Sequence, residues 1–147
     1  MSADKKLTAS FDTYIADIYH ELGNKEKMYQ YYDRVLRNDP ENLYVLNNYA
    51  YFLSEEGIRL DEALKMSAIT IEKEPKNTTY LDTYAWILYK LERYKDAKKW
   101  MEKVLSYDKM PQGINYEHYG DILYKLGNTS IKEKFGIPEL FFCVLFN

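Results

Sequence analysis

Residues Tyr84–Glu92 read YAWILYKLE, and this stretch decides the fold because the chain carries three similar copies of it. The copies at 15–23, 49–57 and 119–127 read IADIYHELG, YAYFLSEEG and YGDILYKLG. Their small second residues, at positions 16, 50, 85 and 120, are spaced by 34, 35 and 35 residues. A period of this length is typical of stacked helical hairpins, in which each unit buries its apolar face against its neighbours.

Composition places the chain among soluble globular proteins. It has 147 residues, about one domain, of which 46% are apolar and 29% charged. The net charge of -3 argues against a nucleic-acid ligand, because phosphate binding depends on clustered positive charge. The polar start has no secretory signal, and no apolar stretch approaches the roughly 20 residues of a membrane-spanning helix. We therefore expect a cytoplasmic location by default, or the cell envelope if the chain is part of a larger exported protein.

Each copy divides into two helical patterns joined by a short break. In the first copy, the three- and four-residue spacing of one helix face is followed by Phe11, Tyr14, Ile15, Ile18, Tyr19 and Leu22. Breaks of about 2 to 5 residues predict antiparallel hairpins. The expected helices lie near 11–22, 28–36, 43–55, 60–73, 79–91, 94–107 and 114–126. The expected organisation is a polar leader at 1–8, repeat units at 9–42, 43–77, 78–112 and 113–135 (the last incomplete), and an apolar tail at 136–147.

This pattern resembles the tetratricopeptide repeat, a helix–turn–helix unit of 34 residues. The third unit carries the residue types of that signature at Leu81, Tyr84, Ala85, Leu88, Ala97 and Met101. The resemblance implies an all-α, right-handed α-solenoid of antiparallel helix hairpins, with about three and a half repeats. It also implies a scaffold for protein–protein interaction, with neither enzymatic activity nor a cofactor. Details such as the Leu-Asp-Glu-Ala sequence at 60–63 look like bacterial arrays of this family.

Small residues mark the predicted contacts within hairpins. Two helices approach to about 8–10 Å only where the contact point carries little side chain. Ala50 facing Ala63, and Ala85 facing Ala97, fit this role. Asp12 departs from the pattern, because the family prefers a large aromatic residue there, so the first unit is expected to pack loosely or to act as a cap.

In this family the first helix of each unit lines the concave side of the solenoid. The register places Asn47, Ser54 and Glu117 among the outward positions there, together with an aromatic stripe. The candidate partner-binding residues are Asn47, Tyr51, Asp82, Trp86, Tyr89, Lys90, Asp121, Tyr124 and Lys125. Aromatic rings with polar tips are common interface anchors, which favours a groove for an extended peptide or a partner helix. The alternative is that these rings pack against neighbouring helices and only rim the core.

The charges of the outward positions indicate the kind of ligand. Six acidic residues and two lysines occupy them, so a basic or polar ligand suits the groove better than an acidic one. Relatives that bind the acidic C-termini of heat-shock chaperones use a clamp of lysine, arginine and asparagine. The matching positions here hold Thr13, Asp17, Asn48, Thr79 and Thr83. Only Asn48 fits the clamp, so binding of chaperone tails is not expected.

The sequence contains no recognisable catalytic or metal-binding motif. His20 and His118 lie in different units without a metal-ligand spacing, and we interpret both as ordinary helix-face residues. There is no Gly-rich phosphate loop, nucleophile elbow or Cys-x-x-Cys pair, and the carboxylates have no oxyanion donor or base beside them. These observations predict a binding protein that needs no metal.

The tail breaks the repeat, because Gly136 and Pro138 interrupt the expected eighth helix. Solenoids generally end in a polar unit, whereas this end is apolar. The tail could fold back over the last hairpin, pair with a second copy to form a homodimer, or mark a fragment or non-native end. The alternative function is therefore a structural module that assembles through its end faces and tail. The candidate oligomerisation residues are Leu140, Phe141, Phe142, Val144, Leu145 and Phe146.

Overall fold

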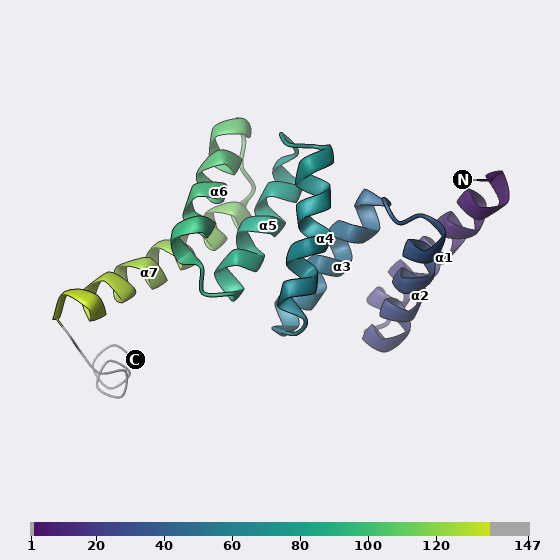
Figure 1. The fold of residues 1–147 in the computed structure, drawn as a ribbon, viewed down its shortest axis with the longest axis horizontal. Helices are drawn as coiled ribbons and strands as arrows, with labels where there is room; N and C mark the ends of the chain where they lie inside the picture. Colours follow the sequence, from purple (N-terminus) through teal and green to yellow (C-terminus); the bar gives the residue numbers. More distant parts are fainter. Residues whose placement is uncertain (1, 136–147) are drawn as a thin grey trace.

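A computed structural model describes the backbone of residues 2–135 and the side chains of residues 2–127, and every regular element in that range is an α-helix (Figure 1). The seven helices confirm the all-α class. They are α1 (Ala3–Glu21), α2 (Lys25–Asn38), α3 (Leu43–Glu56), α4 (Leu60–Lys73), α5 (Thr78–Lys90), α6 (Tyr94–Tyr107) and α7 (Gly113–Phe135).

The helices form an elongated row of hairpins, with α1 and α2 at one end and α7 at the other (Figure 1). Helices α1 and α2, α3 and α4, and α5 and α6 pack as pairs. The first helices of successive units also pack on one another, α3 against α5 and α5 against α7. This arrangement is the predicted α-solenoid, and it brings α3, α5 and α7 together on one side of each hairpin.

Short polar residues fix the helix starts. The side chains of Asn42 and Asn77 cap α3 and α5 by accepting hydrogen bonds from backbone amides of the first turn. Gly57 ends α3 in the left-handed conformation, with φ of 68°, which glycine adopts without strain. These local signals explain why the helix bounds of the second and third units agree with the sequence-based expectation.

The core consists of two clusters. One lies among α1 to α4, includes Tyr32 and Tyr49, and also takes in Ile87 of α5, whereas the buried residues of the other lie on α5, α6 and α7. The predicted small residues are fully buried in these clusters: Ala50, Ala63, Ala85 and Ala97. Each predicted pair therefore lies within one cluster, as expected for close helix contacts.

Replacing Ala85 with leucine is expected to lower the free energy of unfolding by about 1–3 kcal/mol, because the added carbon atoms overpack a helix contact that is already filled. Gly120 occupies the same repeat position in α7 and provides the control. A Cβ built at Gly120 meets no atom within 4 Å. Gly120→Ala is therefore expected to raise stability by up to about 1 kcal/mol through helix propensity. Urea unfolding of both variants measures this difference, and an unchanged stability of Ala85→Leu would contradict the assigned contact.

The apolar face of α1 is not the face that packs against the rest of the chain. Phe11, Tyr14, Ile18 and Leu22 are exposed. Small residues, Ala9 and Ala16, are buried instead, together with Asp12. A helix that approaches its partner closely does so through small side chains. Of the predicted face, Ile15 and Tyr19 are half-buried, and Tyr19 packs against the core. The sequence pattern therefore located the helix but only part of its buried side.

Asp12 is buried because Arg34 of α2 neutralises it. Arg34 Nη2 lies 3.1 Å from Asp12 Oδ1, and the Asp12 side chain is only 4% exposed. The other oxygen, Oδ2, has no hydrogen-bond partner among the described residues. The ion pair thus replaces the aromatic contact that the repeat family prefers at this position.

The two ends of the chain differ from simple repeat units. Residues 3–8 of the predicted polar leader belong to α1, whose N-cap is Ser2. At the other end α7 continues through Gly127 to Phe135 without a hairpin turn. None of the described helices combines the length and the apolar character needed to cross a bilayer. The apolar tail lies outside the described residues: Leu140, Phe141, Phe142, Val144, Leu145 and Phe146.

Candidate functional site

The first helices of the last three units share a pocket of about 270 Å³. Its walls come from α3, from the first half of α5, and from the start of α7 with the loop before it. The pocket-lining residues are Asn47, Asn48, Tyr51, Thr78, Thr79, Asp82, Thr83, Asp108, Gln112, Ile114, Asn115 and His118.

The repeat itself explains why polar groups gather there. Asn47 and Asp82 are 35 positions apart, and so are Asn48 and Thr83. Residues one repeat apart occupy equivalent places on neighbouring first helices, so both pairs fall on the same wall. His118 follows Thr83 by a further 35 positions. The polar wall therefore extends across all three helices.

Asp82 connects α5 to α7. Asn115 Nδ2 donates a hydrogen bond of 2.9 Å to Asp82 Oδ1, and His118 Nδ1 lies 2.9 Å from Asp82 Oδ2. All three residues are buried. Our interpretation of His118 as an ordinary helix-face residue was wrong, because it lies in a buried hydrogen-bonded group. Its repeat position, equivalent to Asn48 and Thr83, is the signal that could have identified it.

Trp86 is packed rather than free, although the register placed it outward. Its ring stacks on His118 with centroids 4.0 Å apart and on Tyr89 with centroids 4.6 Å apart. Its Nε1 donates a 2.6 Å hydrogen bond to Glu55 Oε1 of α3. Trp86 is only 7% exposed and does not line the pocket. The alternative interpretation, in which rings pack against neighbouring helices, describes this residue.

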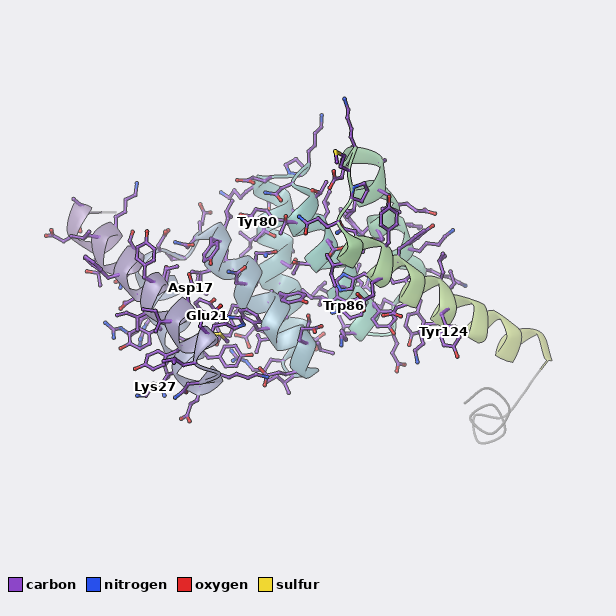
Figure 2. The ribbon with its side chains drawn as sticks, turned by 180° about the vertical axis from the view of Figure 1, so that it is seen from behind. Asp17, Glu21, Lys27, Tyr80, Trp86 and Tyr124 are labelled. Carbon is purple, nitrogen blue, oxygen red and sulfur yellow. The ribbon has the colours of Figure 1, made fainter. Side chains whose placement is uncertain are left out.

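The structure divides the candidate partner-binding residues into two groups. Asn47, Tyr51 and Asp82 line the pocket, although Asn47 and Asp82 are buried rather than outward, as is Ser54. The others lie away from it, and Tyr124 projects from a part of α7 beyond Trp86 (Figure 2). The residues outside the pocket are Trp86, Tyr89, Lys90, Asp121, Tyr124 and Lys125. The neighbouring first helix covers the positions that face it. The register of a single helix does not show this burial.

Lys90 and Tyr89 belong to the Trp86 cluster. Lys90 Nζ lies 3.8 Å from Glu55 Oε1 and 4.8 Å from the centre of the Trp86 ring. Tyr89 also stacks on that ring, and burial together with the carboxylate of Asp121 raises the pKa of its hydroxyl. These side chains stabilise one another, so fewer of them are available for a ligand than the sequence suggested.

The positions that match the chaperone clamp also fall into two groups. Asn48, Thr79 and Thr83 line the pocket, whereas Thr13 and Asp17 lie on α1. Asp17 lies toward the α1 end and accepts a 3.0 Å hydrogen bond from the Tyr44 hydroxyl (Figure 2). The pocket thus includes three of the five positions that match the clamp, and all three hold neutral side chains.

The pocket wall carries negative charge. Asp82 and Asp108 lie on its wall, and the wall described by the structure contains no lysine or arginine. Burial raises the pKa of the Tyr51 hydroxyl, and the nearby carboxylates of Glu55, Asp82 and Glu117 raise it further. Asn47 Oδ1 is buried without a hydrogen-bond partner within the described part of the chain. The available groups therefore favour a ligand that donates hydrogen bonds.

The carboxylates do not form a metal centre. Within the described residues, no three His, Cys, Asp or Glu side chains are grouped so that they could hold a metal ion. The polar groups of the site are amides, hydroxyls, two carboxylates and the His118 imidazole, which suits binding through hydrogen bonds.

Comparison with known proteins identifies the repeat. The tetratricopeptide repeat model matches residues 15–42 and 79–109, which fall in the first and third units. No curated protein matches the chain. The repeat is therefore shown directly in two of the units.

Solved structures of tetratricopeptide repeat domains share the fold. The Sgt2 domain from Aspergillus fumigatus is 16% identical, with a TM-score of 0.75 over 88% of this chain and 84% of that one. The first such domain of Spaghetti (RPAP3), bound to the HSP90 peptide SRMEEVD, is 18% identical, with a TM-score of 0.71 over 82% and 94%. The second domain of human RPAP3, in complex with the HSP70 peptide SGPTIEEVD, is 17% identical, with a TM-score of 0.70 over 80% and 97%.

Proposed function

Because two units match the tetratricopeptide repeat model and the fold is shared with tetratricopeptide repeat domains, we propose that this chain is a protein-interaction scaffold that binds an extended segment of a partner protein along α3, α5 and α7. The observation that carries the proposal is the polar pocket shared by these three helices. Its side-chain amides and hydroxyls provide hydrogen-bonding groups for a peptide backbone and side chains. The same fold holds peptides in the two RPAP3 structures.

The proposed segment is polar or basic. The peptides in the RPAP3 structures end in the acidic sequence EEVD. In this chain the pocket has Thr79 and Thr83 at clamp positions, and Asp82 beside them. A carboxylate at that point would approach Asp82 without a cation on the wall to offset the repulsion. Acidic chaperone tails are therefore poor ligands for this pocket. A bacterial origin of the array stays a prediction from the sequence.

Tyr51 is the proposed aromatic anchor. It lies half-buried at the pocket wall, so a ligand can cover the rest of its ring. Aromatic residues at the centre of an interface often contribute most of the binding energy. Tyr124 and Lys125 lie farther along α7 and serve at most as flanking contacts in this proposal.

The test selects peptides from a random display library on the full chain and titrates the best binder by fluorescence anisotropy. Tyr51→Ala is expected to weaken binding about 10- to 30-fold, equivalent to about 1.4–2 kcal/mol for an interface anchor. Tyr14→Ala is the control, because Tyr14 is a more exposed tyrosine on α1, away from the pocket.

Thermal unfolding of both variants establishes that they remain folded. Equal losses for Tyr51→Ala and Tyr14→Ala would contradict binding at the pocket. Failure of the library to yield any binder that competes at the pocket would contradict the peptide-scaffold function itself.

A further inference from the structure

We propose that the pocket between α3, α5 and α7 recognises one arginine side chain of the bound segment, with Asp82 as its counter-ion. This inference rests on the proposed function, because the arginine belongs to the peptide that occupies the groove. It assigns to the pocket a specific chemical selectivity that the fold alone does not imply.

The first argument is the unpaired acceptor in the wall. Asn47 is 6% exposed, and its Oδ1 has no hydrogen-bond partner among the described residues. Its Nδ2 makes one long hydrogen bond, 3.4 Å, to Asn48 Oδ1. A buried acceptor without a donor is unfavourable, so a small rotation of this amide toward a ligand donor is favourable.

The second argument is the charge of Asp82. Its carboxylate is buried, with its side chain 10% exposed. Asn115 is a neutral donor, and His118 offers a full positive charge only when protonated. Each carboxylate oxygen can accept more than one hydrogen bond, so Asp82 can still accept from a ligand. A buried carboxylate with a neutral donor set is stabilised by a nearby cation.

The third argument is that the wall supplies no permanently charged cation of its own. Its described residues contain neither lysine nor arginine, and Asp108 adds a second carboxylate. Asp108 Oδ1 accepts a 2.9 Å hydrogen bond from the Met110 amide, and this bond fixes the carboxylate in the loop before α7. Two carboxylates and an amide oxygen on one wall exclude anions and attract a cation.

Arginine fits this set of acceptors better than lysine does. A guanidinium has five N–H donors in a planar fork and can address several acceptors at once, whereas an ammonium is a compact, strongly hydrated point charge. The pocket volume of about 270 Å³ equals the share of roughly nine water molecules in the liquid. That space accepts one long side chain but not a helix.

The experiment compares four short probes on the full chain: acetyl-Ser-Ala-X-Ala-Ser-amide with X as arginine, citrulline, lysine or glutamate. Citrulline keeps the size of arginine and removes its charge. Amide chemical shifts of the ¹⁵N-labelled protein report both affinity and position. The arginine probe is expected to bind about 10- to 100-fold more tightly than the citrulline probe, as expected for hydrogen bonds to a charged group. Its shifts should centre on Asn47, Asp82 and His118.

Variants test the role of Asp82. Asp82→Asn keeps the shape and should reduce the arginine-to-citrulline preference to about one. Glu72→Gln removes an exposed carboxylate on α4 and should leave the preference unchanged. Asp82→Asn also alters the contact with α7, so a second variant is needed. Asp108→Asn changes the carboxylate in the loop before α7, and we expect it to lose part of the arginine-to-citrulline preference. Thermal unfolding of each variant establishes the folded state.

Several outcomes would overturn the inference. Equal binding of the arginine and citrulline probes, tighter binding of glutamate, or no binding of any probe at the pocket would each do so. Preferred binding of lysine would refute the guanidinium but keep the counter-ion role of Asp82. The library selection separates the two proposals. Pocket binders without a basic residue would leave the scaffold function intact and remove the arginine site.

Discussion

Replacing His118 with phenylalanine is expected to lower the free energy of unfolding by about 2–3 kcal/mol, because the buried Asp82 carboxylate loses a donor. Phenylalanine keeps a ring that can stack on Trp86, where the imidazole now lies at 4.0 Å between centroids. It removes both ring nitrogens, including the Nδ1 that lies 2.9 Å from Asp82 Oδ2. The variant therefore isolates the hydrogen bond that ties α7 to α5.

His118→Asn is the matched control. Its side-chain amide can place a nitrogen near the position of Nδ1 and so keep the contact with Asp82, while the ring is lost. We expect this variant to lose about 0.5–1.5 kcal/mol, the usual contribution of a ring pair beyond its buried area. Urea unfolding followed by circular dichroism measures both. A His118→Phe variant as stable as the original chain would show that Asp82 does not need this partner.

Replacing Arg34 with methionine is expected to cost about 2–3 kcal/mol, because it leaves the buried carboxylate of Asp12 without a counter-charge. This lies below the full effect of breaking a buried pair, since the Arg34 side chain is 47% exposed and partly hydrated. Methionine keeps much of the apolar stem that Arg34 packs against its neighbours. The loss should therefore report on charge rather than on packing.

The double variant Asp12→Leu with Arg34→Met provides the control. Replacing both members of a buried ion pair by apolar residues is often neutral or stabilising. We expect the double variant to regain most of the stability lost by Arg34→Met alone. A thermodynamic cycle of the four proteins gives the coupling energy. Additive losses, with no recovery in the double variant, would contradict a role of Arg34 in neutralising Asp12.

Helices, their order and their class could be predicted from sequence because their determinants are local. The apolar period, the asparagine caps and Gly57 lie within a few residues of the ends they define. The helices expected at 43–55 and 60–73 accordingly agree with α3 and α4 to within one residue. Helix α7 departs from this agreement, because the glycine at 127 does not end it. A glycine permits a turn without imposing one.

The candidate site was predictable only in part. The register placed Asn47, Tyr51 and Asp82 on neighbouring first helices, and all three line the pocket, because equivalent residues of successive repeats lie side by side. It did not show that Trp86 is covered by its contacts with Glu55, Tyr89 and His118. The contacts with Glu55 and His118 depend on how α3 and α7 pack against α5, which the pattern of a single helix does not contain.

The sequence by itself determined that this chain is a row of helix hairpins, since the period of 34 to 35 residues and the small residues at the joints permit few other arrangements. Only the tertiary structure decided which side of each helix is buried and which polar groups meet. It turned the apolar face of α1 outward and joined His118 to Asp82 across α5 and α7. The physical reason is that periodicity is set within one helix, whereas burial is set by the neighbour that packs on it.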